Sequence, residues 1–77
     1  MDNNHRVMLT KEGLAELKKE LEELSSVKRP QAVTRLAEAR SQGDLSENSE
    51  YAAAKEELSF IDGRIAELKD IINSAKV

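Results

Sequence analysis

The chain has 77 residues, of which 35% are charged and 3% aromatic, and its net charge is −3. The chain is too short for a Rossmann or barrel enzyme. It has too few glycines, prolines and aromatic residues for an all-β fold, and its lack of cysteine argues against a disulfide framework and the usual zinc finger. The acidic balance also argues against a generic binder of duplex nucleic acid, because such proteins need a basic surface.

More than half of the residues are Ala, Glu, Lys, Leu or Arg, which is typical of long helices and coiled coils. After an N-terminal entry segment over residues 1–9, of which residues 7–9 are expected to be extended, Thr10 is a good N-cap for a first helix. A repeat of 3.5 residues then follows, formed by Leu14, Leu17, Leu21 and Leu24. We therefore expect the first arm of a coiled coil over about residues 10–42.

The apolar repeat changes phase in the middle of this arm. The next positions in register are Lys28 and Gln31, both of which are polar. The apolar residues are instead Val27, Ala32, Leu36 and Ala39. Pro30 lies close to this change, lacks an amide hydrogen, and has a ring that crowds the carbonyl of Ser26. The sequence therefore predicts a kink or a break near residues 26–29.

The second arm shows a more regular pattern, with apolar residues at alternating spacings of three and four. They are Tyr51, Ala54, Leu58, Ile61, Ile65, Leu68, Ile72 and Ala75. Two amphipathic helices joined by a short loop pack antiparallel. The predicted fold is therefore all-α, an antiparallel two-helix coiled-coil hairpin, with a tip over residues 43–49 and a second arm over about residues 47–76.

Two acidic residues three positions apart, Asp44 and Glu47, follow Gly43, which is suited to end the first helix. One interpretation is a capping box, in which Asp44 is the N-cap of the second helix and Glu47 its third residue. The other is a metal site, since residues three apart share a helix face and two carboxylates can share a hard cation such as Mg²⁺. Two ligands do not complete an octahedral shell, so another molecule would supply the rest. Both interpretations can hold together.

Charge is distributed unevenly around the tip. Residues 28–40 contain four basic residues and one acidic residue, whereas residues 44–57 contain five acidic residues and one basic residue. These charges are either an ordinary solvated helix surface or part of a binding site. In the second interpretation Arg40 and Lys55, one on each arm near the tip, contact phosphates of a nucleic acid strand.

A continuous motif surrounds the tip: Gly43-Asp44-Leu45-Ser46-Glu47-Asn48, then Glu50-Tyr51 and Ala53-Ala54-Lys55-Glu56. Together with Thr10-x-x-Gly13, Arg29-Pro30 and Ala39-Arg40, this motif resembles the N-terminal coiled coil of the bacterial Gre transcript-cleavage factors, from about residue 7 to Val77. Glu56 and Glu57 lie where one subtype of that family has a stronger basic patch, so the chain is more similar to the other subtype. The intact tip motif also distinguishes it from the inhibitory paralogues.

The resemblance implies a function. Gre factors bind bacterial RNA polymerase, insert the hairpin through its secondary channel, and stimulate the polymerase's own cleavage of backtracked RNA. The chain is then an accessory factor and not an enzyme. The family's catalytic tip acids correspond to Asp44 and Glu47, which would hold Mg²⁺ jointly with the polymerase, close to the DNA–RNA hybrid.

The resemblance also assigns supporting residues around the acids. Arg40 and Lys55 match the basic patch that contacts the extruded 3′ end of the nascent RNA, and Asn48, Glu50 and Tyr51 match residues that support the tip. Gre factors carry a C-terminal globular domain that docks on the polymerase, and we expect this chain to lack it.

A different class of function fits the same pattern. A structural or oligomerising coiled coil would use the acidic tip residues only as helix caps, and self-association of the hairpin is left open. The longest apolar runs have three residues, so no membrane span, signal peptide or anchor is expected. We therefore expect a soluble, cytoplasmic protein.

Overall fold

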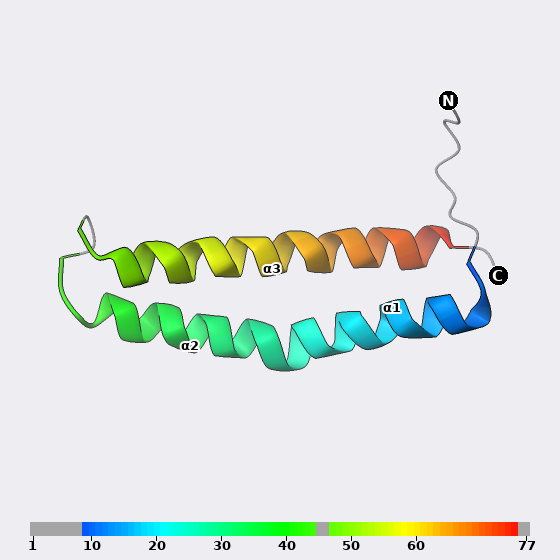
Figure 1. The fold of residues 1–77 in the computed structure, drawn as a ribbon, viewed down its shortest axis with the longest axis horizontal. Coiled ribbons are helices and arrows are strands. Elements are labelled where there is room, and N and C mark those ends of the chain that lie inside the picture. Colours follow the sequence, from blue (N-terminus) through cyan, green and yellow to red (C-terminus); the bar gives the residue numbers. More distant parts are fainter. Residues whose placement is uncertain (1–8, 45–46, 76–77) are drawn as a thin grey trace, which may run out of the picture.

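The computed structural model describes residues 9–44 and 47–75, and these residues form an all-helical hairpin. Two long arms lie side by side and are connected at one end (Figure 1). The longest dimension is 49 Å. The predicted all-α coiled-coil hairpin is therefore confirmed. Apart from Leu9, the N-terminal entry segment over residues 1–9 lies outside the described residues.

Helix α1 (Lys11–Glu23) begins after Thr10, as its sequence predicts. The Thr10 hydroxyl oxygen accepts a hydrogen bond of 2.8 Å from the amide of Gly13, and this satisfies one of the free amides of the first turn. Glycine is suited to this third position because a Cβ there would lie only 3.2 Å from the Thr10 hydroxyl. The small residue thus leaves room for the cap.

The first arm continues through a π-helical turn, η1 (Leu24–Lys28), into helix α2 (Arg29–Arg40). At this turn the amide of Arg29 bonds to the carbonyl of Leu24, five residues earlier instead of four. Pro30 then lies in the first turn of α2, where a missing amide hydrogen costs least. The predicted kink is confirmed, and the arm is bent but not broken.

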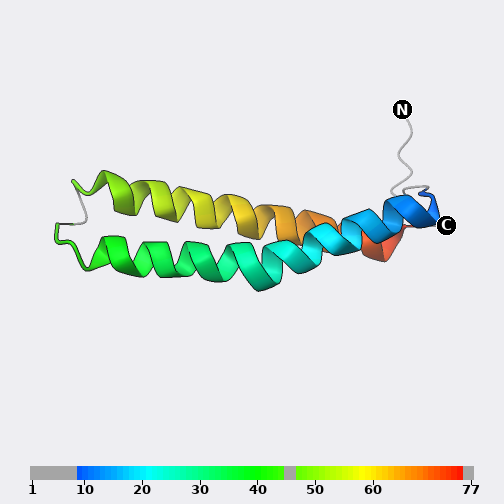
Figure 2. The ribbon, with the colours of Figure 1, turned by 60° about the horizontal axis from the view of Figure 1, so that its bottom comes forward.

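The π-turn also explains the change of phase in the apolar repeat. Ala32 and Ala39 are buried, and each lies one position later than an unbroken continuation of the leucine repeat would place it. A π-turn holds one residue more than an α-turn. The extra residue therefore lets both halves of the first arm direct their apolar residues toward the second arm. Figure 2 shows α2 beside the second arm and α1 passing across it.

Helix α3 (Ser49–Ser74) forms the second arm. All eight residues of its predicted apolar repeat are buried or half-buried, whereas the polar residues between them are mostly exposed. The buried side chains in the described part of both arms are Ala32, Ala39, Ala54, Ile61 and Leu68. Three of them are alanines that belong to the half of the hairpin nearer the tip. Because the distance between helices depends on the side chains at their contact, these alanines allow the arms to approach closely there.

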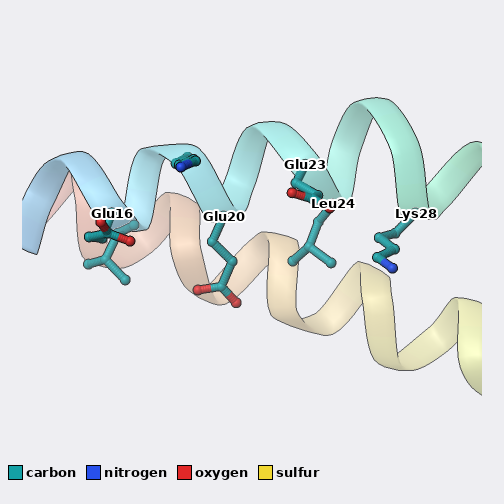
Figure 3. A pocket seen from close by; sticks show the side chains of 7 residues that line it. Glu16, Glu20, Glu23, Leu24 and Lys28 are labelled. Atoms are coloured by element: carbon teal, nitrogen blue, oxygen red, sulfur yellow. The ribbon is translucent and has the colours of Figure 1, made fainter.

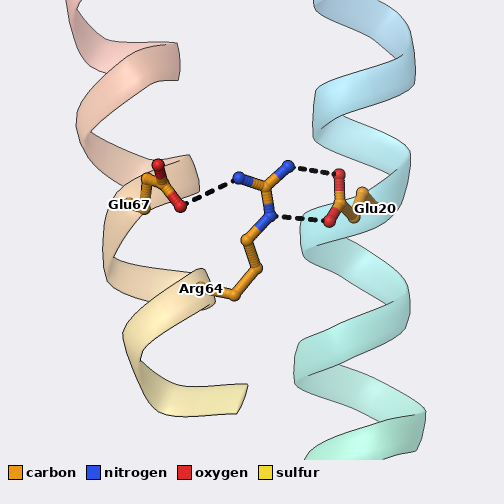
Figure 4. Close-up of polar contacts among 3 residues, drawn as sticks. All are labelled: Glu20, Arg64 and Glu67. Atoms are coloured by element: carbon orange, nitrogen blue, oxygen red, sulfur yellow. Dashed lines mark hydrogen bonds and ion pairs between the residues drawn. The ribbon is translucent and has the colours of Figure 1, made fainter. Parts of the chain in front are cut away.

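Ion pairs join the two arms along their length. Arg29 bonds to Asp62 at 2.7 Å, and Arg35 pairs with Glu57. Nearer the open end, Arg64 of α3 forms a two-pronged pair with Glu20 of α1, at 2.8 and 3.0 Å, and also bonds to Glu67 (Figure 4). These groups are partly exposed, so each pair contributes little stability, but together they favour one register of the arms.

The ion pair of Glu20 gives an expected dependence on pH. The hydrogen bonds from Arg64 lower the pKa of the Glu20 carboxyl below its ordinary value of 4.5, with a smaller effect of the Arg64 charge. A carboxyl whose pKa is lower in the folded state stabilises the fold above its ordinary pKa, and this contribution is lost as the pH falls through the folded value. Glu20→Gln should therefore lower Tm at pH 7 and reduce the fall in Tm between pH 7 and pH 3.

Thermal unfolding followed by circular dichroism measures both effects. The matched control is Glu16→Gln on the same helix, since Glu16 forms no ion pair with any residue that the structure describes. Equal loss of Tm on acidification in the wild-type chain and in Glu20→Gln would contradict the prediction.

Candidate functional site at the tip

The first arm ends in a tight turn that requires glycine. The amide of Ser41 bonds to the carbonyls of Ala37 and Glu38, and its hydroxyl donates to the Glu38 carbonyl at 2.7 Å. Two residues later Gly43 has a φ of 123°, a backbone conformation that residues with a Cβ rarely adopt. A side chain at Gly43 would meet nothing within 4 Å, so the backbone conformation and not a lack of space selects glycine.

The second arm begins at Ser49, and its N-cap is Asn48. The Asn48 side-chain oxygen accepts a hydrogen bond of 3.0 Å from the amide of Tyr51, the third residue of the helix. The prediction that Asp44 is the N-cap and Glu47 the third helical residue is therefore wrong. Glu47 directly precedes the cap, and neither acidic residue belongs to a helix.

Asn48 also bonds to the first arm. Its side-chain nitrogen donates a hydrogen bond of 2.7 Å to the carbonyl of Ala39, in the last turn of α2. One half-buried side chain thus bonds to a carbonyl in the last turn of one helix and to an amide in the first turn of the next. The two helix ends are joined directly beneath the loop that carries the acidic pair.

Asp44 and Glu47 lie between α2 and α3, in the loop that joins the two arms, and both residues are exposed. The two residues between them lie outside the described part of the chain. Because neither acid is helical, the predicted common helix face does not exist, and the pair is held by one loop instead.

The carboxylate oxygens of Asp44 and Glu47 are suited to part of the coordination shell of a hard cation. Carboxylate oxygens are the ligands that Mg²⁺ prefers, but Mg²⁺ takes six ligands. Among the described residues, no group of three or more His, Cys, Asp or Glu side chains could hold a metal ion. Asp44 and Glu47 alone would supply only part of such a shell.

Arg40, Tyr51 and Lys55 lie close together next to the tip. The Arg40 guanidinium lies 6.0 Å from the centre of the Tyr51 ring, within the range of a cation–π contact. Tyr51 and Lys55 are four residues apart on α3 and so share a face of that helix. Arg40 and Lys55 are exposed, and neither forms an ion pair within the described ranges. Arg40 therefore lies beside Tyr51, and Lys55 shares a helix face with Tyr51.

The remaining basic residues of this region behave differently. Arg29 and Arg35 pair with carboxylates of α3, so their charge is largely compensated. Glu50, predicted to support the tip, lines a shallow hollow with Arg35, Ser49 and Ala53. The positive charge available to a ligand near the tip is therefore that of Arg40 and Lys55.

Another groove lies away from the tip, along α1 and η1, with a volume of about 400 Å³ (Figure 3). It is lined by Glu16, Leu17, Lys19, Glu20, Glu23, Leu24 and Lys28. The stems of these side chains make up most of its wall, and one of its carboxylates, that of Glu20, is bonded to Arg64. The groove offers no nucleophile paired with a base, so the tip remains the best candidate site.

Within the described ranges, no helix combines the length and the apolar character needed to cross a membrane.

Comparison with protein families matches residues 7–77 to the family described as "Transcription elongation factor, N-terminal", that of GreA and GreB.

Several curated proteins named transcription elongation factor GreA are similar to the chain. The protein from Lactococcus lactis subsp. cremoris (strain SK11) is 55% identical over 75 residues, covering 90% of this chain and 48% of that protein. The protein from Anaeromyxobacter sp. (strain K) is 58% identical over 72 residues, covering 94% and 43%. The protein from Rhodospirillum rubrum is 51% identical over 72 residues, covering 94% and 46%. The chain thus spans slightly less than half the length of these relatives.

Proposed function

The chain belongs to the N-terminal domain family of the transcription elongation factors GreA and GreB, and from this premise we propose that it acts as a GreA-type accessory factor of bacterial RNA polymerase. In this proposal the hairpin enters the secondary channel of the polymerase and stimulates the polymerase's own cleavage of backtracked RNA, which rescues arrested elongation complexes in the cytoplasm. The observation that carries the proposal is the exposed pair Asp44 and Glu47 at the far end of a 49 Å hairpin.

The shape of the hairpin supports this use. A slender rod can pass through a channel that excludes a globular domain, and the buried alanines keep the arms close together near the tip. The ion pairs between the arms limit sliding of one arm along the other. The paired helices thus hold the acidic loop at a fixed distance from the open end of the hairpin.

Asp44 and Glu47 are the proposed catalytic residues, and they would hold Mg²⁺ together with acidic residues of the polymerase. When bound, this ion supplies activation of the attacking water and neutralisation of charge on the reacting phosphate. The two carboxylates bring hard oxygen ligands to a place where the polymerase alone holds a second ion weakly. They also orient water next to the RNA by accepting its hydrogen bonds.

Arg40 and Lys55 are proposed to contact the extruded 3′ end of the RNA. Both are exposed cations close to the tip, and the contact with Tyr51 restricts the orientation of the Arg40 guanidinium. Asn48, Glu50 and Tyr51 are proposed to support the tip, which would lie near the DNA–RNA hybrid. Contacts to phosphates position a strand without reading its sequence, as a factor acting on any transcript requires.

The alternative of a structural coiled coil depends on Asp44 and Glu47 as helix caps. The cap of α3 is Asn48, so the helix begins without either acid in that role. The capping role on which this alternative depends is therefore filled by Asn48.

The test uses a chimera, because the chain spans less than half of its relatives. Residues 7–77 of this chain replace the corresponding residues of the L. lactis factor. Purified bacterial RNA polymerase is stalled in a backtracked complex, and shortening of the labelled RNA is followed with and without the chimera over a range of Mg²⁺ concentrations. We expect faster cleavage with the chimera. No acceleration at any Mg²⁺ concentration, in an assay where the L. lactis factor is active, would reject the proposed function.

A further inference from the structure

We infer that Asn48 is a positioning residue, whose bond to the Ala39 carbonyl closes the base of the tip loop and thereby fixes how Asp44 and Glu47 are presented. The expected effect of this bond on cleavage rests on the proposed function, whereas its effect on the loop can be measured in the chain alone.

The bond joins two residues nine positions apart, across the turn between the arms. The Asn48 side-chain nitrogen lies 2.7 Å from the Ala39 carbonyl oxygen, and the group is partly buried. The same carbonyl also accepts the amide of Gln42 at 3.1 Å. Both acceptor positions of this oxygen are thus used, one by the start of the loop and one by its end.

This bond links the two ends of the loop directly. At Gly43 the backbone has a φ of 123°, a conformation that glycine adopts readily because it has no Cβ. Groups that act together on one ligand must be held to within about 0.5 Å. A link at the base of the loop restricts the separation of its two acidic residues.

The chemistry of the side chain identifies asparagine as the residue suited to both bonds. Serine and aspartate are equally good N-caps, because each accepts the helix amide. Serine is too short to reach the Ala39 carbonyl, and ionised aspartate has no hydrogen to donate. Only asparagine combines the cap on Tyr51 with a donor to Ala39.

Asn48→Ser separates these two contributions without adding charge. It retains an N-cap for α3 and removes the link to the first arm. In the chain itself, amide hydrogen exchange measured by NMR should become faster at Gln42, because loss of the link lets the start of the loop separate from its end, and should change little at Tyr51 and at Leu68. Ser49→Ala, an exposed neighbour of Asn48, is the control and should leave exchange at Gln42 unchanged.

In the chimera, Asn48→Ser should raise the Mg²⁺ concentration for half-maximal stimulation of cleavage by about two- to tenfold, the factor expected for loss of one hydrogen bond. Saturating Mg²⁺ should restore the rate, and the concentration of chimera that gives half-maximal effect should not change. A residue that only stabilised the helix would lower activity equally at all Mg²⁺ concentrations.

Two results would overturn the inference: unchanged exchange at Gln42, or a loss of cleavage that saturating Mg²⁺ does not restore. Failure of the proposed function gives a different result. In that case Asp44→Asn with Glu47→Gln leaves cleavage unchanged, whereas faster exchange at Gln42 in Asn48→Ser still supports the link between the helix ends.

Discussion

Asp44→Asn combined with Glu47→Gln in the chimera should reduce stimulated RNA cleavage by about 100-fold while leaving helix content and Tm unchanged. The substitutions retain the size of each side chain and remove the negative charge that attracts a cation. Because Asn48 caps α3, neither acid is needed for the helix to begin. Cleavage of a backtracked complex measures activity, and circular dichroism measures folding.

The hairpin offers a control with the same chemical change. Glu16 of α1 and Asp70 of α3 are also exposed, they lie away from the tip, and neither forms an ion pair with a residue that the structure describes. Glu16→Gln with Asp70→Asn makes the same change in total charge and should retain full stimulation. If the tip variant still rescues stalled polymerase as well as this control does, the role of the acids in holding the cation is wrong.

Leu68→Ala should destabilise the hairpin by about 2–5 kcal/mol, the range for truncation of a large side chain in a packed core. Leu68 has an exposed fraction of 0%, and it is the largest fully buried side chain in the described part of the chain. A domain of this size buries little surface, and small domains have total stabilities of only about 5–15 kcal/mol. We therefore expect Leu68→Ala to lower Tm strongly and to shift the midpoint of urea unfolding.

Phe60→Ala is the matched control for this prediction. It removes an even larger side chain from the same helix, but Phe60 is 78% exposed. Its effect on the free energy of unfolding should stay within about 0.5 kcal/mol, as at other surface positions. Equal destabilisation by the two variants would show that Phe60 is buried in solution, for example between two copies of the chain, and would contradict the monomeric packing described above.

The apolar repeat was sufficient to predict the second arm. Side chains three and four residues apart lie on one face of a helix, so the spacing from Tyr51 to Ala75 identifies the buried face without any knowledge of the partner helix. The same reasoning located the disturbance near Pro30. The apolar repeat did not distinguish a bend from a break, because the outcome depends on whether both halves of the first arm can pack on α3 at the same time.

The start of the second arm was predicted wrongly because two capping patterns compete at the tip. Asp44 and Glu47 have the spacing of a capping box, and asparagine is an equally good cap. The signal that favours Asn48 is its position three residues before Tyr51, the first apolar residue of the arm. The side chain of Asn48 accepts the amide of Tyr51, just as the side chain of Thr10 accepts the amide of Gly13 three residues later. The bond from Asn48 to Ala39 had no signal in the sequence, because it depends on how the loop brings the helix ends together.

The π-turn in the first arm has a consequence for how such hairpins can change in length. A residue inserted into a regular α-helix turns everything beyond it by about 100° and moves the apolar face away from its partner. Here the additional residue is accommodated within one turn, and the alanines beyond it still face α3. A homologue without that residue could keep the same buried faces with a straighter arm. Gains and losses of a single residue at this point are therefore compatible with an unaltered acidic loop, which makes the middle of the arm a tolerant site for evolutionary change.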